Sequence, residues 1–255
     1  MASKDPVIGT CRLCDEVTTL RDSHIVPKWA YKRITSDDGP GPTQPIMVEF
    51  DVATITNKQF TEHLLCDSCE QLFSAWENSL SQLLVQKDGA FPWLDLVAPK
   101  RTTGAADSAA VDATAVAKFA CSVFWRASVT RKLSVQLRLG PYEESIRRYL
   151  RDEEPFPDAA SLIVSLGLSS KEGLPSLARF IVMPQSKRDG GCHIHAFAMC
   201  GALFYLVVGG IKIAYADTFC FVRKRIVDVR SSDDLMRSWR QLTGGAEQKG
   251  KLSRI

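Results

Sequence analysis

The stretch CRLCDEVTTLRDSHIVP, residues 11–27, places two cysteines two residues apart and follows them with a histidine. A second pair of cysteines with the same spacing occurs in HLLCDSCEQLF, residues 63–73. Two C-x-x-C pairs can supply four thiolates to one tetrahedral zinc ion. We therefore expect a structural Zn²⁺ site whose ligands are Cys11, Cys14, Cys66 and Cys69.

The number of residues between the two pairs bears on the structure around this site. Residues 15–65 separate them, whereas about 15–20 residues are typical of zinc ribbons, so folded structure must fill the gap. The second pair opens a stretch with helical apolar spacing, and a helix N-terminus stabilises thiolate charge. Two alternatives are four free or buried cysteines and a redox-active pair, although no βαβ pattern surrounds either motif.

Composition sets the broad class of the protein. The chain has 255 residues, is 45% hydrophobic and 24% charged, and carries a net charge of +3. These values are those of an ordinary globular protein, and the mild charge does not by itself indicate nucleic-acid binding. The N-terminus MASKDPVIGT has no apolar core of a secretory signal. We expect a cytoplasmic protein whose cysteines are thiols or metal ligands.

One segment, AFAMCGALFYLVVGG at 196–210, is apolar and uncharged. It is shorter than the roughly 20 residues that a membrane-spanning helix needs. Its glycines, aromatic residues and β-branched residues favour buried strands with Gly209-Gly210 at a turn. We therefore expect no membrane association.

Between the cysteine pairs lies Ser23-His24-Ile25-Val26-Pro27. Together with the flanking pairs, this motif resembles the zinc-stapled HNH, or His-Me finger, endonucleases. In that family a C-x-x-C precedes a strand that ends in Asp-His-Ile-x-Pro, and a second C-x-x-C opens a helix. The resemblance covers residues 11 to about 80. The longer pattern SHIVPKWAYK…LLCDSCEQLFSAWE is also similar to a group of uncharacterised bacterial proteins with such a zinc region.

The resemblance implies metal-dependent hydrolysis of nucleic-acid phosphodiester bonds. It makes His24 the general base and Glu70, directly after Cys69, a ligand of a catalytic Mg²⁺ or Mn²⁺. Ser23 stands where the family has an acid or a histidine. The family's middle asparagine has no clear counterpart; Glu62 or His63 falls nearest.

Each of these roles has a structural alternative. His24 can hold the first cysteine pair in place through a backbone carbonyl or act as a zinc ligand, and Glu70 can be an acid favoured by the helix dipole. Glu77, two turns further on, is expected to be exposed. The matching alternative function is a non-catalytic zinc-binding module that binds nucleic acid or a partner protein.

The whole chain reads as an α+β protein. We expect an N-terminal zinc-stapled ββα-like module, then a helical segment and an antiparallel sheet. The expected domains are an HNH-like module at 1–90, a C-terminal α+β domain at 91–243 and a disordered tail at 244–255. Residues 35–45 are expected to form a loop. Helices are predicted at 112–130, 141–151, 158–166 and 232–242. Strands are predicted within 46–60, and from residue 177 onwards in LARFIVMP, HIHAFAMC, LFYLVV, IKIAYA and TFCFVRKRIV.

The remaining chemistry-bearing residues form smaller groups. Cys121, Cys200 and Cys220 lie in apolar runs and are expected to be buried thiols. Cys192, with His193 and His195, suggests a second metal site or the nucleophile of a cysteine hydrolase; the alternative is a strand entered from a glycine turn. Two basic groups can contact phosphates or simply face solvent: Lys28, Lys32 and Arg33, and Arg223, Lys224 and Arg225.

Overall fold

The computed structural model describes residues 5–34, 46–49, 52–56, 58–86, 88–133, 137–168, 178, 180–209, 214–243 and 247–249. The helices within these ranges are α1 (Lys28–Ile34), α2 (Asp67–Ser81), α3 (Pro92–Val97), α4 (Ala113–Val129), α5 (Tyr142–Leu150), α6 (Ala214–Thr218), α7 (Phe221–Lys224) and α8 (Ser232–Thr243). The strands are β1 (Ile8–Thr10), β2 (Val17–His24), β3 (Ile46–Glu49), β4 (Val52–Ile55), β5 (Thr61–Cys66), β6 (Gly104–Asp107), β7 (Ala160–Leu168), β8 (Phe180–Asp189), β9 (Cys192–Met199), β10 (Ala202–Val208), β11 (Ile226–Ser231) and β12 (Glu247–Lys249).

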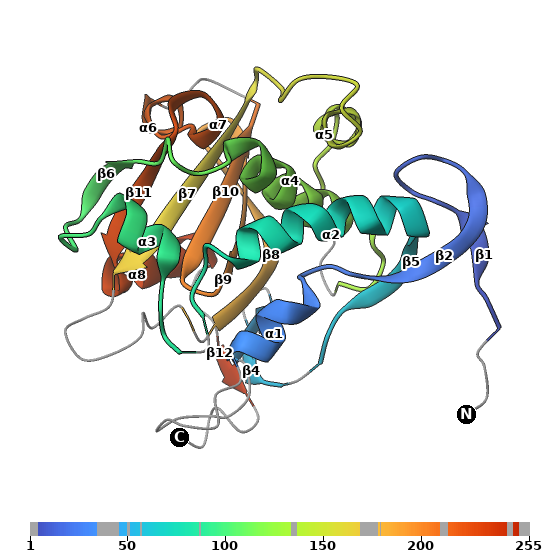
Figure 1. Ribbon diagram of the computed structural model, residues 1–255, viewed down its shortest axis with the longest axis horizontal. Helices are drawn as coiled ribbons and strands as arrows, with labels where there is room; N and C mark the ends of the chain where they lie inside the picture. The colour runs from blue at the N-terminus through green and yellow to red at the C-terminus, as the bar shows by residue number, and fades with distance from the viewer. Residues whose placement is uncertain are drawn as a thin grey trace.

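The described strands form two sheets, so the fold is α+β as expected. The smaller sheet has the order β1-β2-β5 and is antiparallel. The larger has the order β12-β4-β3-β8-β9-β10-β7-β11-β6 (Figure 1). This larger sheet is mixed, because β3–β8, β7–β11 and β4–β12 are parallel pairs. The strands β3 and β4 lie within residues 1–90, so this part of the chain contributes to both sheets.

Helix α4 lies at the centre of the molecule. Its first turn is capped by Asp112, whose carboxylate accepts hydrogen bonds from the amides of Thr114 and Ala115. The helix is apolar on nearly every side, and all its residues except Thr114 are buried. Such a helix can only be stable inside a core. The larger sheet covers one side of α4, through side chains such as Phe197 and Phe204, and α2 and α5 cover others (Figure 1).

The opposite face of the larger sheet carries two smaller clusters. Leu235 of α8 packs against Leu203 and neighbouring alanines, and Ala216 of α6 packs against Ile163 and Val207. Central strands of this sheet are therefore buried on both faces. Strand β7 is buried along its whole length.

Several sequence predictions need correction here. The segment 158–166 was predicted to be helical but belongs to strand β7. IKIAYA was predicted to be a strand, but α6 begins at Ala214, and 211–213 lie outside the described residues. The 196–210 segment also contains a hairpin turn at Cys200 and Gly201, which was not predicted; Gly209, with φ of 71°, follows the end of β10, and Gly210 lies outside the described residues. TFCFVRKRIV contains α7 before β11 begins.

Two predicted irregular segments lie partly or wholly outside the described residues. The loop at 35–45 falls entirely outside them, as does most of the tail at 244–255. Residues 247–249 of that tail form β12, which pairs with β4. The helices predicted at 112–130, 141–151 and 232–242 are confirmed as α4, α5 and α8.

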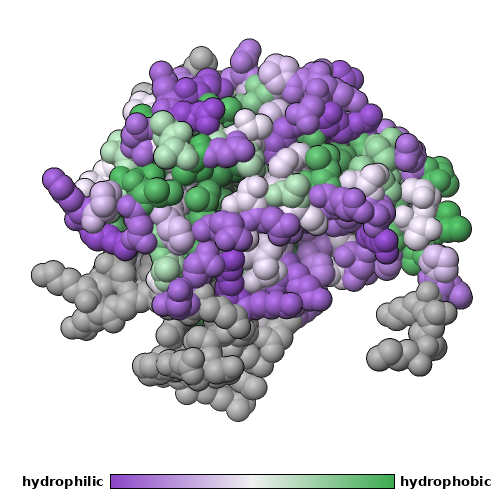
Figure 2. All heavy atoms as spheres, in the orientation of Figure 1, coloured by the Kyte–Doolittle hydropathy of each residue, from purple (hydrophilic) through white to green (hydrophobic). Residues whose placement is uncertain are grey.

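The molecular surface is predominantly hydrophilic on the face seen in Figure 2, but hydrophobic residues are exposed at the end where Figure 1 places β1. Among the described helices, none combines the length and the apolar character that crossing a bilayer requires. The apolar segment at 196–210 instead forms parts of β9 and β10, as predicted.

Candidate metal centre

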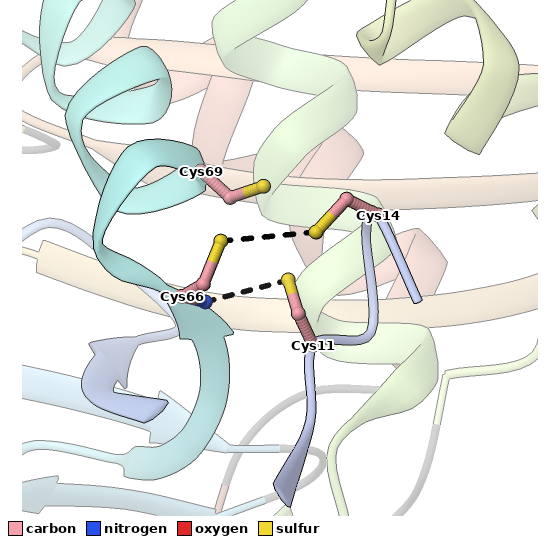
Figure 3. A group of neighbouring side chains, drawn as sticks. All are labelled: Cys11, Cys14, Cys66 and Cys69. Atoms are coloured by element: carbon pink, nitrogen blue, oxygen red, sulfur yellow. Dashed lines mark hydrogen bonds between the residues drawn. The ribbon is translucent and has the colours of Figure 1, made fainter. Parts of the chain in front are cut away.

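The two C-x-x-C pairs meet beside the smaller sheet. The first pair, Cys11–Cys14 (the first knuckle), occupies the turn after β1, and the second pair, Cys66–Cys69 (the second knuckle), joins β5 to α2 (Figure 3). Their four sulfur atoms all lie within 4.8 Å of one another. Cys14 Sγ is 3.8 Å from Cys66 Sγ. A tetrahedral ion with Zn–S bonds of about 2.3 Å places its sulfurs about 3.8 Å apart. The four thiols are therefore arranged to hold a metal ion such as zinc.

Backbone hydrogen bonds fix the two knuckles against each other. The Arg12 amide donates to the Leu64 carbonyl at 2.9 Å, which ties the first knuckle to β5. The Cys66 amide donates to Cys11 Sγ at 3.3 Å. Such N–H···S contacts stabilise negative charge on sulfur, which is the state that binds metal.

Burial and local hydrogen bonds set the chemistry of the sulfurs. Burial raises the pKa of the Cys66 thiol, but hydrogen bonds from the Ser68 hydroxyl, 3.1 Å away, and from the Cys69 amide lower that pKa to about 7. Burial raises the pKa of Cys69. The Cys66 thiol can thus lose its proton near neutral pH and start metal binding. Cys14 is the partly exposed member of the group, and the other three are buried.

The two residues assigned a catalytic role by resemblance, His24 and Glu70, lie outside the four-cysteine group. His24 is the last residue of β2, and its Nε2 lies 2.9 Å from Gln59 Oε1. Glu70 is in the first turn of α2, and its buried Oε1 has no hydrogen-bond partner among the described residues. In the described part of the chain, the four cysteines are the one group of three or more His, Cys, Asp or Glu side chains close enough to hold a metal ion. His24 and Glu70 belong to no such group.

The polar groups around His24 form hydrogen bonds with other parts of the fold. Ser23 is fully buried, and its hydroxyl donates to the Arg21 carbonyl. The His24 carbonyl accepts a hydrogen bond from Arg126 Nη1 at 2.6 Å. Glu62 accepts hydrogen bonds from the Thr130 hydroxyl and the Arg131 amide at the end of α4.

Glu77 was predicted to be exposed, and that prediction is wrong. Its side chain is 15% exposed and pairs at 2.8 Å with Arg126, whose side chain is 1% exposed. This ion pair joins α2 to α4, and sequence reasoning missed it because 49 residues separate its partners. The basic residues after His24 are also partly engaged: Arg33 donates to the Ser81 carbonyl and stacks on Trp29.

The Cys192 region does not form a catalytic pair. Cys192 is buried, and alternation along β9 places its side chain on the face opposite to His193 and His195. His195 is also buried, and its Nδ1 is hydrogen-bonded to the Ser186 hydroxyl at 2.6 Å. Cys121, Cys200 and Cys220 are buried free thiols, as predicted.

A second feature that the sequence does not reveal lies at the first knuckle. The carbonyl of Leu13, between the two cysteines, accepts a hydrogen bond from Arg147 of α5, 134 residues away. No local pattern signals such a contact. Comparison with known protein families, with curated proteins and with solved structures finds no match for this chain.

Proposed function

We propose that the four cysteines bind one Zn²⁺ and that the zinc-stapled sheet is a non-catalytic module that docks a partner protein along β1. Four sulfur ligands in a tetrahedron are typical of structural zinc sites, which leave no open position for a substrate. The closed set of four thiols supports this reading, as does the hydrogen bond that engages His24 Nε2.

The observation that carries the docking proposal is the exposed apolar surface formed by β1 and the start of β2. Large hydrophobic side chains are exposed at five described positions, and three of these lie around the first knuckle: Val7 at 43%, Ile8 at 70% and Val17 at 74%. Ile8 pairs with Thr19, and Thr10 pairs with Val17, so these four side chains share one face of the sheet. Ile8 on the edge strand and Val17 beside it on β2 thus expose apolar surface next to a free strand edge, which is typical of an interaction site.

The backbone of β1 is also available for pairing. β1 is the outer strand of its sheet. The Val7 carbonyl and the Cys11 amide bond to the β2 side of the hairpin. Hydrogen bonding alternates along an antiparallel strand, so the main-chain groups of Ile8 and Thr10 point away from β2. An extended peptide can add a strand there by β-augmentation.

Charge favours a particular occupant. Within the described residues 5–20, the exposed acids are Asp5, Asp15 and Glu16, and the exposed cation is Arg12; Asp15 is also paired with Arg147. Nucleic acid would need the opposite balance. The partner is therefore an extended protein segment that alternates apolar and basic residues.

Peptide selection tests this proposal. Peptides selected from a random library against the zinc-loaded protein should alternate apolar and basic residues and should shift the amide signals of Ile8 and Thr10 in NMR spectra. Val17→Glu should weaken their binding about tenfold or more, because a buried valine contributes roughly 1.5–3 kcal/mol. Leu96→Glu is the matched control, since Leu96 is 57% exposed on α3. Peptides that bind the Val17 variant as well as the wild type would contradict docking on β1.

A second candidate is the HNH-like nuclease, favoured by the order of its elements. β2 and β5 are antiparallel neighbours in the sheet, α2 follows β5 directly, and His24 ends β2. This order supports an HNH-like ββα module. If it is active, His24→Ala should reduce Mg²⁺- or Mn²⁺-dependent plasmid nicking by about 10²–10⁴-fold while zinc content is unchanged. Wild-type protein that cuts neither DNA nor RNA with either ion rules this candidate out.

A further inference from the structure

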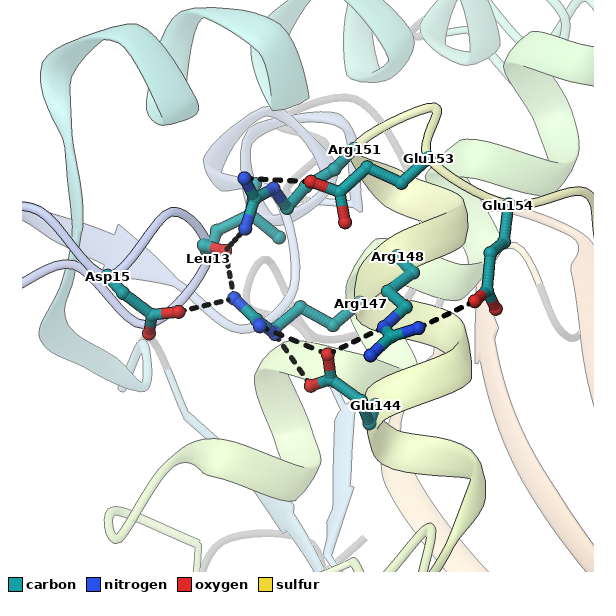
Figure 4. A network of polar contacts seen from close by, with 8 residues as sticks. All are labelled: Leu13, Asp15, Glu144, Arg147, Arg148, Arg151, Glu153 and Glu154. Atoms are coloured by element: carbon teal, nitrogen blue, oxygen red, sulfur yellow. Dashed lines mark hydrogen bonds and ion pairs between the residues drawn. The ribbon is translucent and has the colours of Figure 1, made fainter.

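The first knuckle is held from outside by helix α5 (Figure 4). Arg147 Nη1 donates to the Leu13 carbonyl at 2.7 Å, and Arg151 Nη1 lies 3.5 Å from the same oxygen. Leu13 stands between the two cysteines of the knuckle and is itself buried. A carbonyl held at this point fixes the peptide that enters Cys14.

Arg147 is itself locked in one orientation. Its Nε and Nη2 donate to the two carboxylate oxygens of Glu144, at 2.7 and 3.0 Å. Its Nη1 also donates to Asp15 Oδ2 at 2.9 Å. The planar guanidinium therefore has partners on three sides, and this geometry suits arginine and not lysine. The hydrogen bonds that Glu144 accepts, from Arg147 above all and also from Arg148, hold the pKa of its carboxyl group below the ordinary value.

The first knuckle needs such support more than the second does. The second knuckle is continuous with β5 and α2, which hold Cys66 and Cys69 in regular structure. The first knuckle is a turn, and the next residue, Asp15, has a left-handed backbone with φ of 64°. That conformation is unfavourable for a residue other than glycine. The bond from Arg147 to Asp15 stabilises the turn in this conformation.

We propose that Arg147 is a positioning residue of the metal centre, which acts through the Leu13 carbonyl and Asp15 to keep Cys11 and Cys14 at metal-binding spacing. Four thiolates and one Zn²⁺ carry a net charge of −2, so a nearby guanidinium also offsets negative charge. The inference rests on zinc occupancy of the four-cysteine site and not on the identity of any partner.

Linkage makes the effect reciprocal. If Arg147 strengthens zinc binding, bound zinc must strengthen the attachment of α5 to the knuckle by the same free energy. Amide hydrogens of residues 142–150 should therefore exchange more slowly in the zinc-loaded protein. That difference should shrink when Arg147 is replaced, which a purely local packing role would not produce.

Arg148 offers a matched control on the same helix. It forms ion pairs with Glu144 at 3.1 Å and with Glu154 at 2.8 Å, and Figure 4 shows it directed away from the knuckle. Arg147→Met and Arg148→Met thus each remove one arginine that binds Glu144, but only the first removes the hydrogen bond to Leu13. Zinc affinity, measured by competition with a chromophoric chelator, should fall about 10–100-fold in Arg147→Met. It should change less than about threefold in Arg148→Met.

Arg147→Lys keeps the charge but loses the fork, so its zinc affinity should lie between that of the wild type and that of Arg147→Met. This variant keeps the test decisive if Arg147→Met does not fold. Substitution with Co²⁺ gives a second readout, because its visible spectrum reports the geometry of the four sulfurs. Wild-type zinc affinity in both Arg147 variants, or equal losses in the Arg147 and Arg148 variants, would overturn the proposal. A wild-type protein that binds no zinc would instead refute the proposed function itself.

Discussion

Arg126 is a buried cation on which three parts of the chain converge. Its guanidinium donates to the His24 carbonyl at the end of β2 and to Glu77 on α2, and it lies over the ring of Phe73. The residue belongs to α4, so it connects the central helix to the smaller sheet. A buried ion pair adds little over a well-packed apolar pair, but the loss of one partner leaves an uncompensated charge.

Replacing Arg126 by methionine should therefore lower the free energy of unfolding by about 3–5 kcal/mol. The expected cause is the unpaired Glu77 carboxylate together with the unsatisfied His24 carbonyl. Urea denaturation measures the change. The double variant Arg126→Met/Glu77→Leu should recover part of the loss, because it also removes the stranded charge. No recovery would show that the ion pair is not the dominant interaction at this position.

His195 makes stability depend on pH. Burial, with a smaller contribution from His193, lowers the pKa of His195 from its ordinary value of 6.5 to about 4 in the folded protein. The unfolded chain therefore binds a proton at His195 between pH 6.5 and 4 while the folded protein does not. Stability is full above pH 6.5 and falls as the pH drops through this window, by about 3 kcal/mol in total.

His195→Gln should remove this dependence, because glutamine can keep a hydrogen bond to Ser186 and does not titrate. The measurement is the difference in unfolding free energy between wild type and variant at several pH values. The difference should change by about 3 kcal/mol between pH 6.5 and 4. A constant difference across the window would mean that the pKa of His195 is the same in the folded protein as in the unfolded chain.

At the scale of elements, the sequence predicts helices well where the apolar pattern is one-sided. The helices α2 and α8 have clear polar faces, and both lie close to their predicted positions. The sequence wrongly predicts a helix at strand β7, because ASLIVSLGL has no charged residue, does not alternate polar and apolar residues, and is buried along its whole length. A strand buried on both faces has no alternation, so periodicity cannot distinguish it from a buried helix.

In the candidate site, too, the sequence predicts some features and not others. The four cysteines could be predicted because C-x-x-C spacing is a local requirement of metal binding. The contacts of Arg126 with His24 and of Arg147 with Leu13 span 102 and 134 residues. Their geometry depends on how α4 and α5 pack, which no local motif encodes.

The two hairpins of β8–β9 and β9–β10 allow a matched test of packing. Gly191 and Gly201 both have φ of 83°. A Cβ at Gly191 would meet nothing within 4 Å, whereas one at Gly201 would lie 2.9 Å from Val85 Cγ2 and 3.1 Å from Phe91 Cε1. Alanine at either position strains the backbone equally. Only Gly201→Ala also overpacks the core.

Gly201→Ala should therefore be more destabilising than Gly191→Ala by about 1–3 kcal/mol. Thermal or urea unfolding of the two variants gives the comparison directly. Equal losses would indicate that Val85 and Phe91 move aside without cost, and hence that the turn is not tightly packed against the loop after α2.

At the scale of the whole molecule, one core connects the two sheets. The main apolar cluster runs from the first knuckle through α2 and α4 to the larger sheet. The four cysteines lie at one end of this cluster, where the smaller sheet, α2 and α5 meet. Zinc at this position would link two segments that are distant in sequence, and α5 contacts one of them through Arg147. Its removal should therefore loosen the smaller sheet and α5 before the larger sheet.

The most direct test of this account is X-ray absorption at the zinc edge, with metal analysis, on protein purified without chelators. One zinc per chain, bound by four sulfur atoms at about 2.3 Å, is the predicted result. A protein without zinc, or a zinc with a nitrogen or oxygen ligand in place of one of the four cysteines, would contradict the account.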